Sequence, residues 1–426
     1  MSAPENTHYV TPEQLCVGLY VHLDLSWMDH PFSFSSFKIK NDEEVETIRQ
    51  LGLSRIRIEP GKSACKPLPV APLEKPVLPP VVAVAEPVDL EISKERKERI
   101  ERLNRIKRDI AEVEKEFQRA ADTIRNLTHN VYSRPLEARQ EAENLVGKMV
   151  ECIMSKGDVM IHAMSEKLGE DIYFHSLNVT VLSLILAKEL DIGEEESRHL
   201  GMGAVFHDIG KIEIPPKILM KTDPLTKSEQ SFFELHCEYG HDIATKIGLS
   251  KQAADIVMQH HEYADGSGYP GKLTGDKISP LSKIVSIVNV YDNLCNPQSI
   301  NDALTPHEAL SQMFTVKRSK FDAVVLKAFI HCMGVFPPGS IVQLSNEMLG
   351  LVLSVNSARP LKPNVLVYDP GIPKDEAMII SLESETELNI SKSMRPGQLP
   401  REVFQYLNPR KRVTYYFDPN KQHEPA

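Results

Sequence analysis

The chain has 426 residues, which leaves room for more than one domain. Its hydrophobic share of 41% and charged share of 25% are typical of a globular protein in water. No apolar run is long enough to span a membrane, and the first residues lack the apolar segment of a signal peptide, so we expect a cytoplasmic protein without membrane attachment. The formal net charge of −10 argues against a surface that coats a nucleic acid polymer.

The cysteines are scattered and show no CxxC spacing, so neither a disulfide framework nor a structural zinc cluster is expected. Reduced, mostly buried thiols are the better interpretation. The six are Cys16, Cys65, Cys152, Cys237, Cys295 and Cys332.

Residues 1–62 predict a small α+β domain with a regulatory role. Residues 18–25 and 54–58 alternate between apolar and polar as strands do, and residues 42–51 carry a helical pattern. Residues 63–89 are rich in proline and form an extended linker.

Residues 90–144 predict a charged helical connector, with a break at residues 133–135 where a second helix begins. Its apolar positions recur every three or four residues. This stripe has two interpretations of equal standing: a helix packed on its own chain, or a short coiled coil that forms a homodimer through residues 90–133. The stripe consists of Ile100, Leu103, Ile106, Ile110, Val113 and Phe117.

A compact charged cluster, His207-Asp208 followed by Lys211, comes directly after an apolar run at residues 200–206. Burying these groups together is costly unless each is paired or coordinated, and a metal ion is the simplest explanation. Lys211 follows His207 by four residues, so on a helix it would share its face and meet a phosphate oxygen. The alternative is a salt bridge from Lys211 to Asp208 or a neighbouring acid.

Further histidines at helix-like positions follow in the region 157–334, which reads as successive helices. Imidazole and carboxylate ligands suit Fe, Mn, Zn or Ni, and more than four ligands imply more than one ion. Two ions can clamp both oxygens of an in-line displacement at phosphorus, which indicates phosphoester hydrolysis. Asp171 precedes His175 by four residues and is either a further ligand or a surface acid. The candidates are His175, His207, Asp208, His236, His260 and His261.

Three motifs in order resemble the HD-GYP family: His207-Asp208, His260-His261-Glu262 and the run Asp265-Gly-Ser-Gly-Tyr-Pro270. This family is a branch of the HD metallophosphohydrolases, and its members hydrolyse cyclic di-GMP. The resemblance covers residues 145–345 and implies a mainly α protein with an all-helical HD-type domain. Residues 8–63 also resemble the N-terminal domain of unknown function that often precedes such domains.

The resemblance implies roles for the candidates. The histidines and Asp208 would be metal ligands, Asp208 and Lys211 catalytic residues, and Lys211 a contact to the scissile phosphate. The signature loop would line the substrate pocket through Gly266, Gly268, Tyr269 and Pro270. Tyr269 would stack on a guanine or meet a partner domain, and a purely structural turn is its alternative.

Three positions depart from the family pattern. Asn289 stands where the family has an aspartate ligand, and Asp292 is a candidate substitute for it. Residues 298–300 replace an Arg-Pro-Tyr segment that supplies a phosphate-binding cation. Asp171 stands where a subset with three metals has glutamate, so the expected cofactor is two divalent ions, Fe or Mn, or three if Asp171 contributes.

Residues 346–426 predict a short β-rich C-terminal extension, because residues 349–355 and 364–368 alternate as strands do. The whole pattern predicts a cyclic di-GMP phosphodiesterase that forms linear pGpG or GMP. One rival is a weak or inactive sensor or adaptor that binds cyclic di-GMP or a diguanylate-cyclase (GGDEF) domain. The other is an HD hydrolase for another phosphorylated nucleotide.

Overall fold

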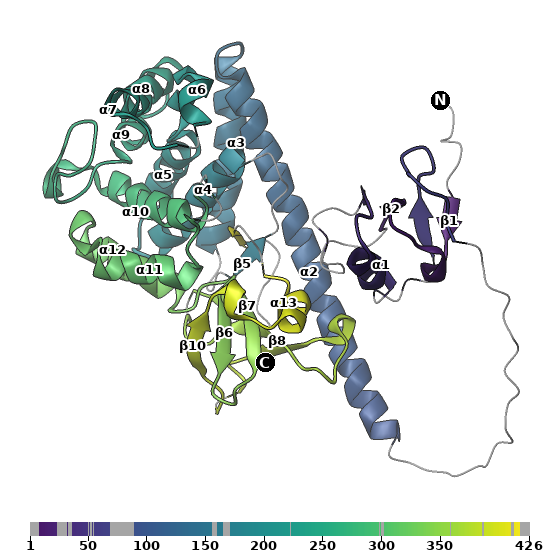
Figure 1. Ribbon diagram of the computed structural model, residues 1–426. Coiled ribbons are helices and arrows are strands. Elements are labelled where there is room, and N and C mark those ends of the chain that lie inside the picture. Colours follow the sequence, from purple (N-terminus) through teal and green to yellow (C-terminus); the bar gives the residue numbers. More distant parts are fainter. Residues whose placement is uncertain are drawn as a thin grey trace, which may run out of the picture. The chain divides into compact units, whose positions relative to one another are not determined.

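The computed structural model describes residues 8–23, 32, 36–49, 51, 53, 55–68, 89–155, 160–164, 171–221, 223–297, 299, 302–357, 359–385, 387–409 and 413–417 (Figure 1). It divides into two compact units. One comprises residues 1–98 with 372–376, and the other residues 99–371 with 377–426. Each unit is described by itself.

The N-terminal unit is built on an antiparallel sheet in the order β1-β4-β2-β3. Its predicted helix is confirmed as α1, in which Val45 and Ile48 face the core of the unit. The strands are β1 (His8–Val10), β2 (Tyr20–His22), β3 (Ser36–Lys38) and β4 (Ile56–Ile58), with η1 (Pro12–Gln14) and α1 (Asp42–Arg49) between them.

The predicted connector is a helical hairpin of α2 (Asp89–Asn130) and α3 (Pro135–Ser155). Proline at the first position of α3 explains the sharp start, because the backbone N–H that proline lacks has no partner within the helix at this position. Val113 and Phe117 are buried in the core of the second unit, so this end of the apolar stripe packs on its own chain. The side chains of Ile106 and Ile110 lie outside the described residues, and the homodimer stays a prediction.

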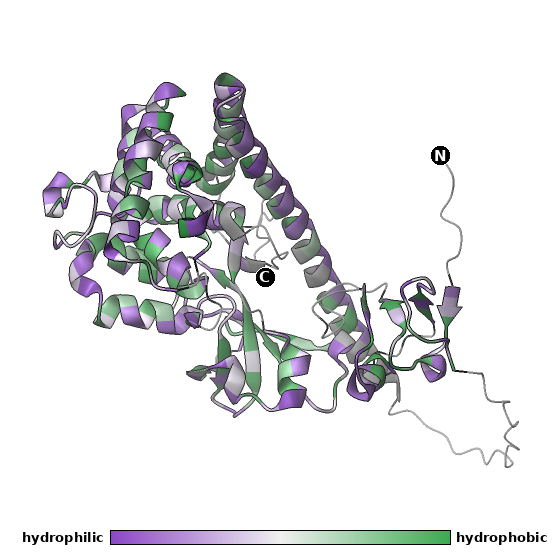
Figure 2. Ribbon diagram, turned by 45° about the horizontal axis from the view of Figure 1, so that its top comes forward, coloured by the Kyte–Doolittle hydropathy of each residue, from purple (hydrophilic) through white to green (hydrophobic). Residues whose placement is uncertain are grey.

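Helices dominate the second unit, as the sequence predicts (Figure 1). Helix α4 is apolar on nearly all its faces and packs against its neighbours α5 and α10, which is typical of a central helix (Figure 2). The helices are α4 (Asp171–Glu189), α5 (Glu194–Phe206), α6 (Pro216–Leu219), α7 (Lys227–Glu234), α8 (His236–Lys246), α9 (Lys251–Gln259), α10 (Pro280–Cys295), α11 (Pro306–Thr315) and α12 (Ala323–Met333), with the 3-10 turns η3 (Ile209–Glu213), η4 (Gly275–Lys277) and η6 (Arg318–Lys320).

A strand, β5 (Met160–Met164), interrupts this helical region, so the expectation of helices throughout is wrong there. It pairs with two strands from the C-terminal part of the chain, β7 and β11. Partners so distant in sequence leave no local pattern from which to predict the strand.

The C-terminal strands join β5 in one sheet with the order β10-β6-β7-β5-β11, and β8 pairs with β7 and β9. The strands are β6 (Ile341–Leu344), β7 (Leu349–Asn356), β8 (Asn364–Val367), β9 (Met378–Ser381), β10 (Ile390–Met394) and β11 (Thr414–Phe417), accompanied by η7 (Lys374–Glu376), η8 (Pro396–Gln398) and α13 (Arg401–Leu407). The predicted extension is thus rich in strands but also contains a helix, and β11 belongs to the core of the helical region.

All six cysteines are free thiols, as expected, although only Cys237, Cys295 and Cys332 are buried. The sulfur atoms of Cys16 and Cys65 lie 3.2 Å apart. Among the described residues, every helix is too short or too polar to pass through a lipid bilayer.

Candidate metal centre

His207 and Asp208 lie at the junction where α5 ends and η3 begins. The buried face of α5 places both side chains in the interior, where Asp208 is only 6% exposed. Gly210 allows η3 to touch α8, since a Cβ atom there would lie 2.0 Å from the carbonyl oxygen of His236 and 2.4 Å from the nitrogen of Gly240. This close approach brings His236 beside Asp208.

Three of the histidines share one local geometry at helix ends. In each, Nδ1 donates to the backbone carbonyl three residues earlier: His207 to Ala204 at 2.7 Å, His236 to Phe233 at 2.7 Å and His260 to Val257 at 2.8 Å. Carbonyls at a helix end lack intrahelical partners, so this arrangement satisfies them. Because a carbonyl only accepts, the proton is on Nδ1 and Nε2 has a free lone pair for a metal.

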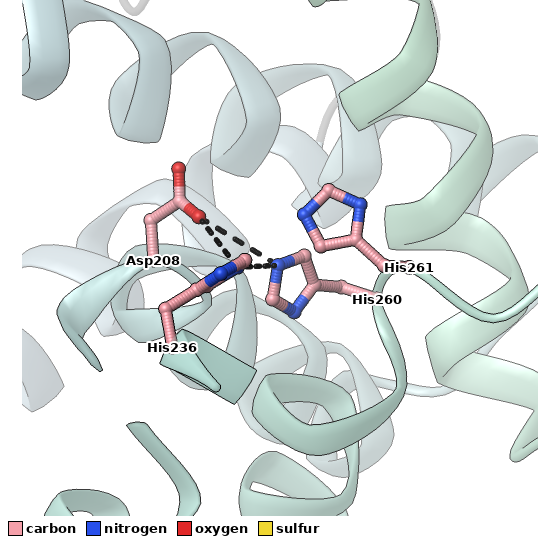
Figure 3. A group of neighbouring side chains, drawn as sticks. All are labelled: Asp208, His236, His260 and His261. Atoms are coloured by element: carbon pink, nitrogen blue, oxygen red, sulfur yellow. Dashed lines mark hydrogen bonds and ion pairs between the residues drawn. The ribbon is translucent and has the colours of Figure 1, made fainter. Parts of the chain in front are cut away.

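One group of potential ligands consists of Asp208, His236, His260 and His261, whose ligand atoms lie within 4.8 Å of one another (Figure 3). Oδ1 of Asp208 lies 3.5 Å from Nε2 of His236 and 3.6 Å from Nε2 of His260. The two imidazole nitrogens are 3.2 Å apart. These separations suit atoms that converge on one ion.

A second group consists of His175, His207 and Asp208. Oδ2 of Asp208 is 3.4 Å from Nε2 of both histidines, which are 3.1 Å from each other. Asp208 therefore belongs to both groups and presents a different oxygen to each. A carboxylate used in this way can bridge two ions.

The donor set fits divalent ions. Among the described residues, Oδ1 of Asp208 is buried and has no hydrogen-bond partner. A buried carboxylate oxygen without a partner is costly, and neighbouring Nε2 lone pairs repel one another. Divalent cations coordinated by these atoms would remove both costs, and the mixed imidazole and carboxylate set is one that transition metals prefer.

The electrostatics prepare most of the group for metal binding. Burial lowers the pKa of His207 to about 4 and that of His236 to about 3, and burial also holds the pKa of His261 well below its usual value. These rings are neutral at pH 7, the form that binds metals. Burial alone would raise the pKa of Asp208, but the charge of Lys211 and the nearby histidines holds that pKa well below normal.

His175 is oriented by Asp292, whose Oδ2 lies 2.6 Å from Nδ1 of the ring. Burial opposes a charge on His175, but hydrogen bonds with Asp208 and Asp292 raise its pKa to about 9. The other oxygen of Asp292 accepts from Asn178 at 2.8 Å and Asn296 at 2.9 Å. This contact is of the kind that orients a metal-binding histidine, and the part of Asp292 as a substitute ligand stays a prediction.

Asn289 is buried, and its amide oxygen accepts a hydrogen bond of 2.7 Å from Asn293 Nδ2. Its role as a ligand stays a prediction. Helix α4 begins at Asp171, but the side chain of this residue lies outside the described residues. Gln298 and Ile300 also lie outside them.

Lys211 Nζ lies 2.5 Å from Asp208 Oδ2, so the alternative interpretation of an ion pair is present. The assumed α-helical spacing to His207 is wrong, because residues 209–213 form a 3-10 helix in which positions three apart align. The Lys211 side chain is 24% exposed, and its contact with a substrate phosphate stays a prediction. Its position beside the shared carboxylate suits that contact.

The signature loop is tied to Glu262, a residue to which the sequence analysis assigned no role. This side chain is 2% exposed, and its carboxylate accepts from the backbone nitrogens of Gly271 at 2.5 Å and Leu273 at 2.8 Å. Gly268 packs so closely on the preceding turn that a Cβ atom would lie 2.4 Å from the carbonyl oxygen of His261. The loop is thereby held against the metal ligands.

Tyr269 stacks on His261, with ring centroids 4.5 Å apart and an interplanar angle of 21°. Its backbone nitrogen also donates to the carbonyl of His261 at 3.1 Å, and the peptide bond to Pro270 is cis. Gly266 adopts a positive φ of 76°, which favours glycine. The predicted loop residues thus lie beside the centre, whereas contact with a substrate stays a prediction.

Comparisons with known proteins agree with this geometry. Residues 148–325 match the HD domain, and residues 9–156 match a domain of unknown function, DUF3391. The chain is 26% identical over 366 residues to cyclic di-GMP phosphodiesterase PA4108 of Pseudomonas aeruginosa, covering 83% of each protein. It is 32% identical to the cyclic di-GMP phosphodiesterase response regulator RpfG of Xanthomonas campestris pv. campestris, over 34% of this chain and 39% of that one. It is 30% identical to 3'3'-cGAMP-specific phosphodiesterase 2 of Vibrio cholerae, over 40% of this chain and 32% of that one.

Proposed function

Since the chain carries an HD domain with the HD-GYP signature behind a DUF3391 domain, we propose that it hydrolyses cyclic di-GMP to pGpG or GMP. The observation that carries the proposal is the position of Asp208, whose two oxygens face two separate groups of imidazoles. A mononuclear or purely structural site would not need this division. The similarity to PA4108 along most of both chains supports the choice of substrate.

Two divalent ions, Fe or Mn, are the proposed cofactors, and a third would require Asp171. Asp208 would bridge them, with His175 and His207 on one and His236, His260 and His261 on the other. When bound, such ions supply Lewis-acid polarisation of the phosphate and activation of water at neutral pH.

The other residues bind and orient the substrate. The ammonium group of Lys211 would donate to a non-bridging oxygen of the scissile phosphate and stabilise the charge that grows there. The ring of Tyr269, held against His261, offers a face on which a guanine can stack. Gly266, Gly268 and Pro270 fix the loop that presents this ring. The same loop is the proposed contact for a diguanylate-cyclase domain.

A second candidate substrate is 3'3'-cGAMP, because several relatives are named as specific for it. It shares one guanine and both phosphodiester bonds with cyclic di-GMP. The non-catalytic sensor is the weaker alternative. The convergence of six candidate ligands supports catalysis, whereas Asn289 and the residues that replace the Arg-Pro-Tyr segment favour the sensor.

The test is turnover by chain loaded with Mn or Fe, followed by chromatography of the nucleotides. We expect cyclic di-GMP to be cleaved, and the double substitution of His207 and Asp208 by alanine to abolish cleavage. Lys211→Ala should lower kcat by about 10²–10³ with unchanged metal content. Lys251→Ala is the matched control, because that lysine is 85% exposed and pairs with Asp255 in its own helix. Nucleotide binding without turnover by metal-replete chain would contradict the proposal and favour the sensor.

A further inference from the structure

The strand β11 (Thr414–Phe417) lies directly behind one half of the metal centre, although it falls far outside the HD domain match at residues 148–325. It pairs with β5 and packs against α4. Its neighbours Asn178 on α4 and Asn296 just after α10 both contact Asp292. This arrangement connects the C-terminal strand to a metal ligand through two amide side chains.

Asn296 is held by the backbone of Val413 on both sides of its amide. Oδ1 accepts from the Val413 nitrogen at 2.8 Å, and Nδ2 donates to the Val413 carbonyl at 2.7 Å. The same Nδ2 donates to Oδ1 of Asp292 at 2.9 Å. All the polar atoms of this side chain are therefore used.

Asn178 makes a similar set of contacts two residues further along the chain, at Tyr415 of β11. Its Oδ1 accepts from the Tyr415 nitrogen at 2.7 Å, and its Nδ2 donates to Oδ1 of Asp292 at 2.8 Å, with a longer contact of 3.4 Å to the Val413 carbonyl. Val413 directly precedes β11 and Tyr415 lies within it, so the two asparagines contact the backbone at the start of the strand.

These contacts determine which way each amide is turned. An asparagine presents either its oxygen or its nitrogen to a neighbour, and the two orientations have nearly the same shape. The N–H groups of Val413 and Tyr415 require an oxygen, so both Nδ2 groups must point to Asp292. Without the strand, either amide could turn its oxygen toward the carboxylate, and the two would repel. Asp292 would then hold His175 less firmly.

The strand itself is firmly placed. Tyr415 is fully buried, and its hydroxyl lies 2.7 Å from that of Tyr291 on α10. Tyr416 packs edge-on against Phe117 of α2, with ring centroids 5.8 Å apart. A strand fixed at both residues can act as a rigid template for the asparagine side chains.

We propose that β11 is a positioning element of the metal centre: through Asn178, Asn296 and Asp292 it orients His175 and so determines the affinity of one of the two ions. The residues that match the HD domain would then need the C-terminal strand to form a complete site for two ions. This inference depends on the proposed metal centre and is independent of which cyclic dinucleotide is cleaved.

The first test substitutes Asn296 by alanine and measures the ions bound per full-length chain during titration with a chelator. The control is Asn364→Ala, which removes a half-buried amide that joins β8 to β7 by a bond of 3.0 Å to Ser354. We expect the Asn296 variant to lose one ion at a chelator concentration about 10-fold lower than wild type. This is the lower end of the usual cost, about 10–100-fold, of losing a histidine's direct partner, because Asn296 acts on His175 only through Asp292. The control should follow wild type.

A spectroscopic measurement distinguishes loss of one ion from general loosening. In chain loaded with Mn, a coupled pair and a single ion give different electron paramagnetic resonance signals. The Asn296 variant should convert to the single-ion signal while its thermal unfolding remains cooperative. Equal loss of both ions, or retention of both as in wild type, would overturn the inference.

Two shortened chains test the strand directly. A chain that ends after residue 408 lacks β11, whereas one that ends after residue 417 keeps it. We expect the shorter chain to bind one ion and the longer chain two, and two tightly bound ions in the shorter chain would overturn the inference. If the shorter chain does not fold, the Asn296 variant decides. A wild-type chain that binds no ions would contradict the proposed function itself.

Discussion

Substitution of Glu262 by glutamine tests how firmly the signature loop is held beside the centre. The carboxylate accepts two backbone N–H groups, one on each oxygen, and is almost completely buried. Glutamine has nearly the same size and keeps one oxygen. Whichever way its amide is turned, the nitrogen faces the N–H of Gly271 or that of Leu273, and two donors then oppose each other.

The magnitude follows from these two contacts. A hydrogen bond to a charged group contributes about 1.5–3 kcal/mol, a neutral one about 1 kcal/mol, and a buried donor left without a partner costs about 1–3 kcal/mol. One weakened bond and one lost bond together destabilise the loop by about 2–4 kcal/mol. Since about 1.4 kcal/mol corresponds to a factor of ten, local opening should become roughly 30- to 700-fold more frequent.

Amide hydrogen exchange at Gly271 and Leu273 measures this opening. We expect faster exchange there in the Glu262 variant and a lower kcat/KM for the cyclic dinucleotide, because Tyr269 is presented by the same loop. Glu238→Gln on the exposed face of α8 is the control. Unchanged protection at both amides would refute the view that the buried carboxylate anchors the loop.

Three further outcomes are expected. Gly210→Ala should lower the free energy of unfolding by about 1–3 kcal/mol and reduce the content of both ions, because the new Cβ would meet the carbonyl of His236. Gly397→Ala, with open space around it, should do neither, and equal effects of the two substitutions would contradict the close approach of η3 to α8. Because the pKa of His175 is raised to about 9 in the metal-free chain, a metal ion must displace the proton on this ring. Metal affinity measured by chelator competition should therefore rise with pH from 7 to 9 and level off above. The same raised pKa stabilises the folded metal-free chain fully below about pH 6.5, and this contribution is lost as pH rises through 9. Asn289→Asp should raise metal affinity or turnover if residue 289 is a ligand, and unchanged values of both would remove it from the ligand set.

The sequence allowed the candidate ligands to be chosen because residues that bind metals leave a chemical signature. Adjacent pairs such as His207-Asp208 and His260-His261 are rare by chance, and the structure brings them together. It did not predict where on the helices they lie. Three of the histidines sit at helix ends, where the ring nitrogen satisfies a free carbonyl, and a periodic pattern does not mark such positions.

The features that the sequence did not predict were missed for a different reason: they depend on contacts between distant segments or on loop conformation. Asn178 and Asn296 carry no metal signature, since amides occur in many roles, and only the structure shows their common partner Asp292. The strands β5 and β11 are short, and each finds its partner more than a hundred residues away. Glu262 was visible within the His-His-Glu motif, but its two backbone contacts depend on the conformation of the loop that follows.

The two halves of the centre are built in different ways, and this has a consequence for how it fails. Around His236 and His260 the orienting contacts come from carbonyls three residues away, so any chain that forms these helices also forms the contacts. Around His175 the orienting contact comes from Asp292, whose own partners depend on β11. A contact formed within one helix turn survives as long as the helix does, whereas one that requires three distant segments is lost when any of them separates. The ion that we propose His175 binds should therefore be the first to leave under denaturant, truncation or low metal supply.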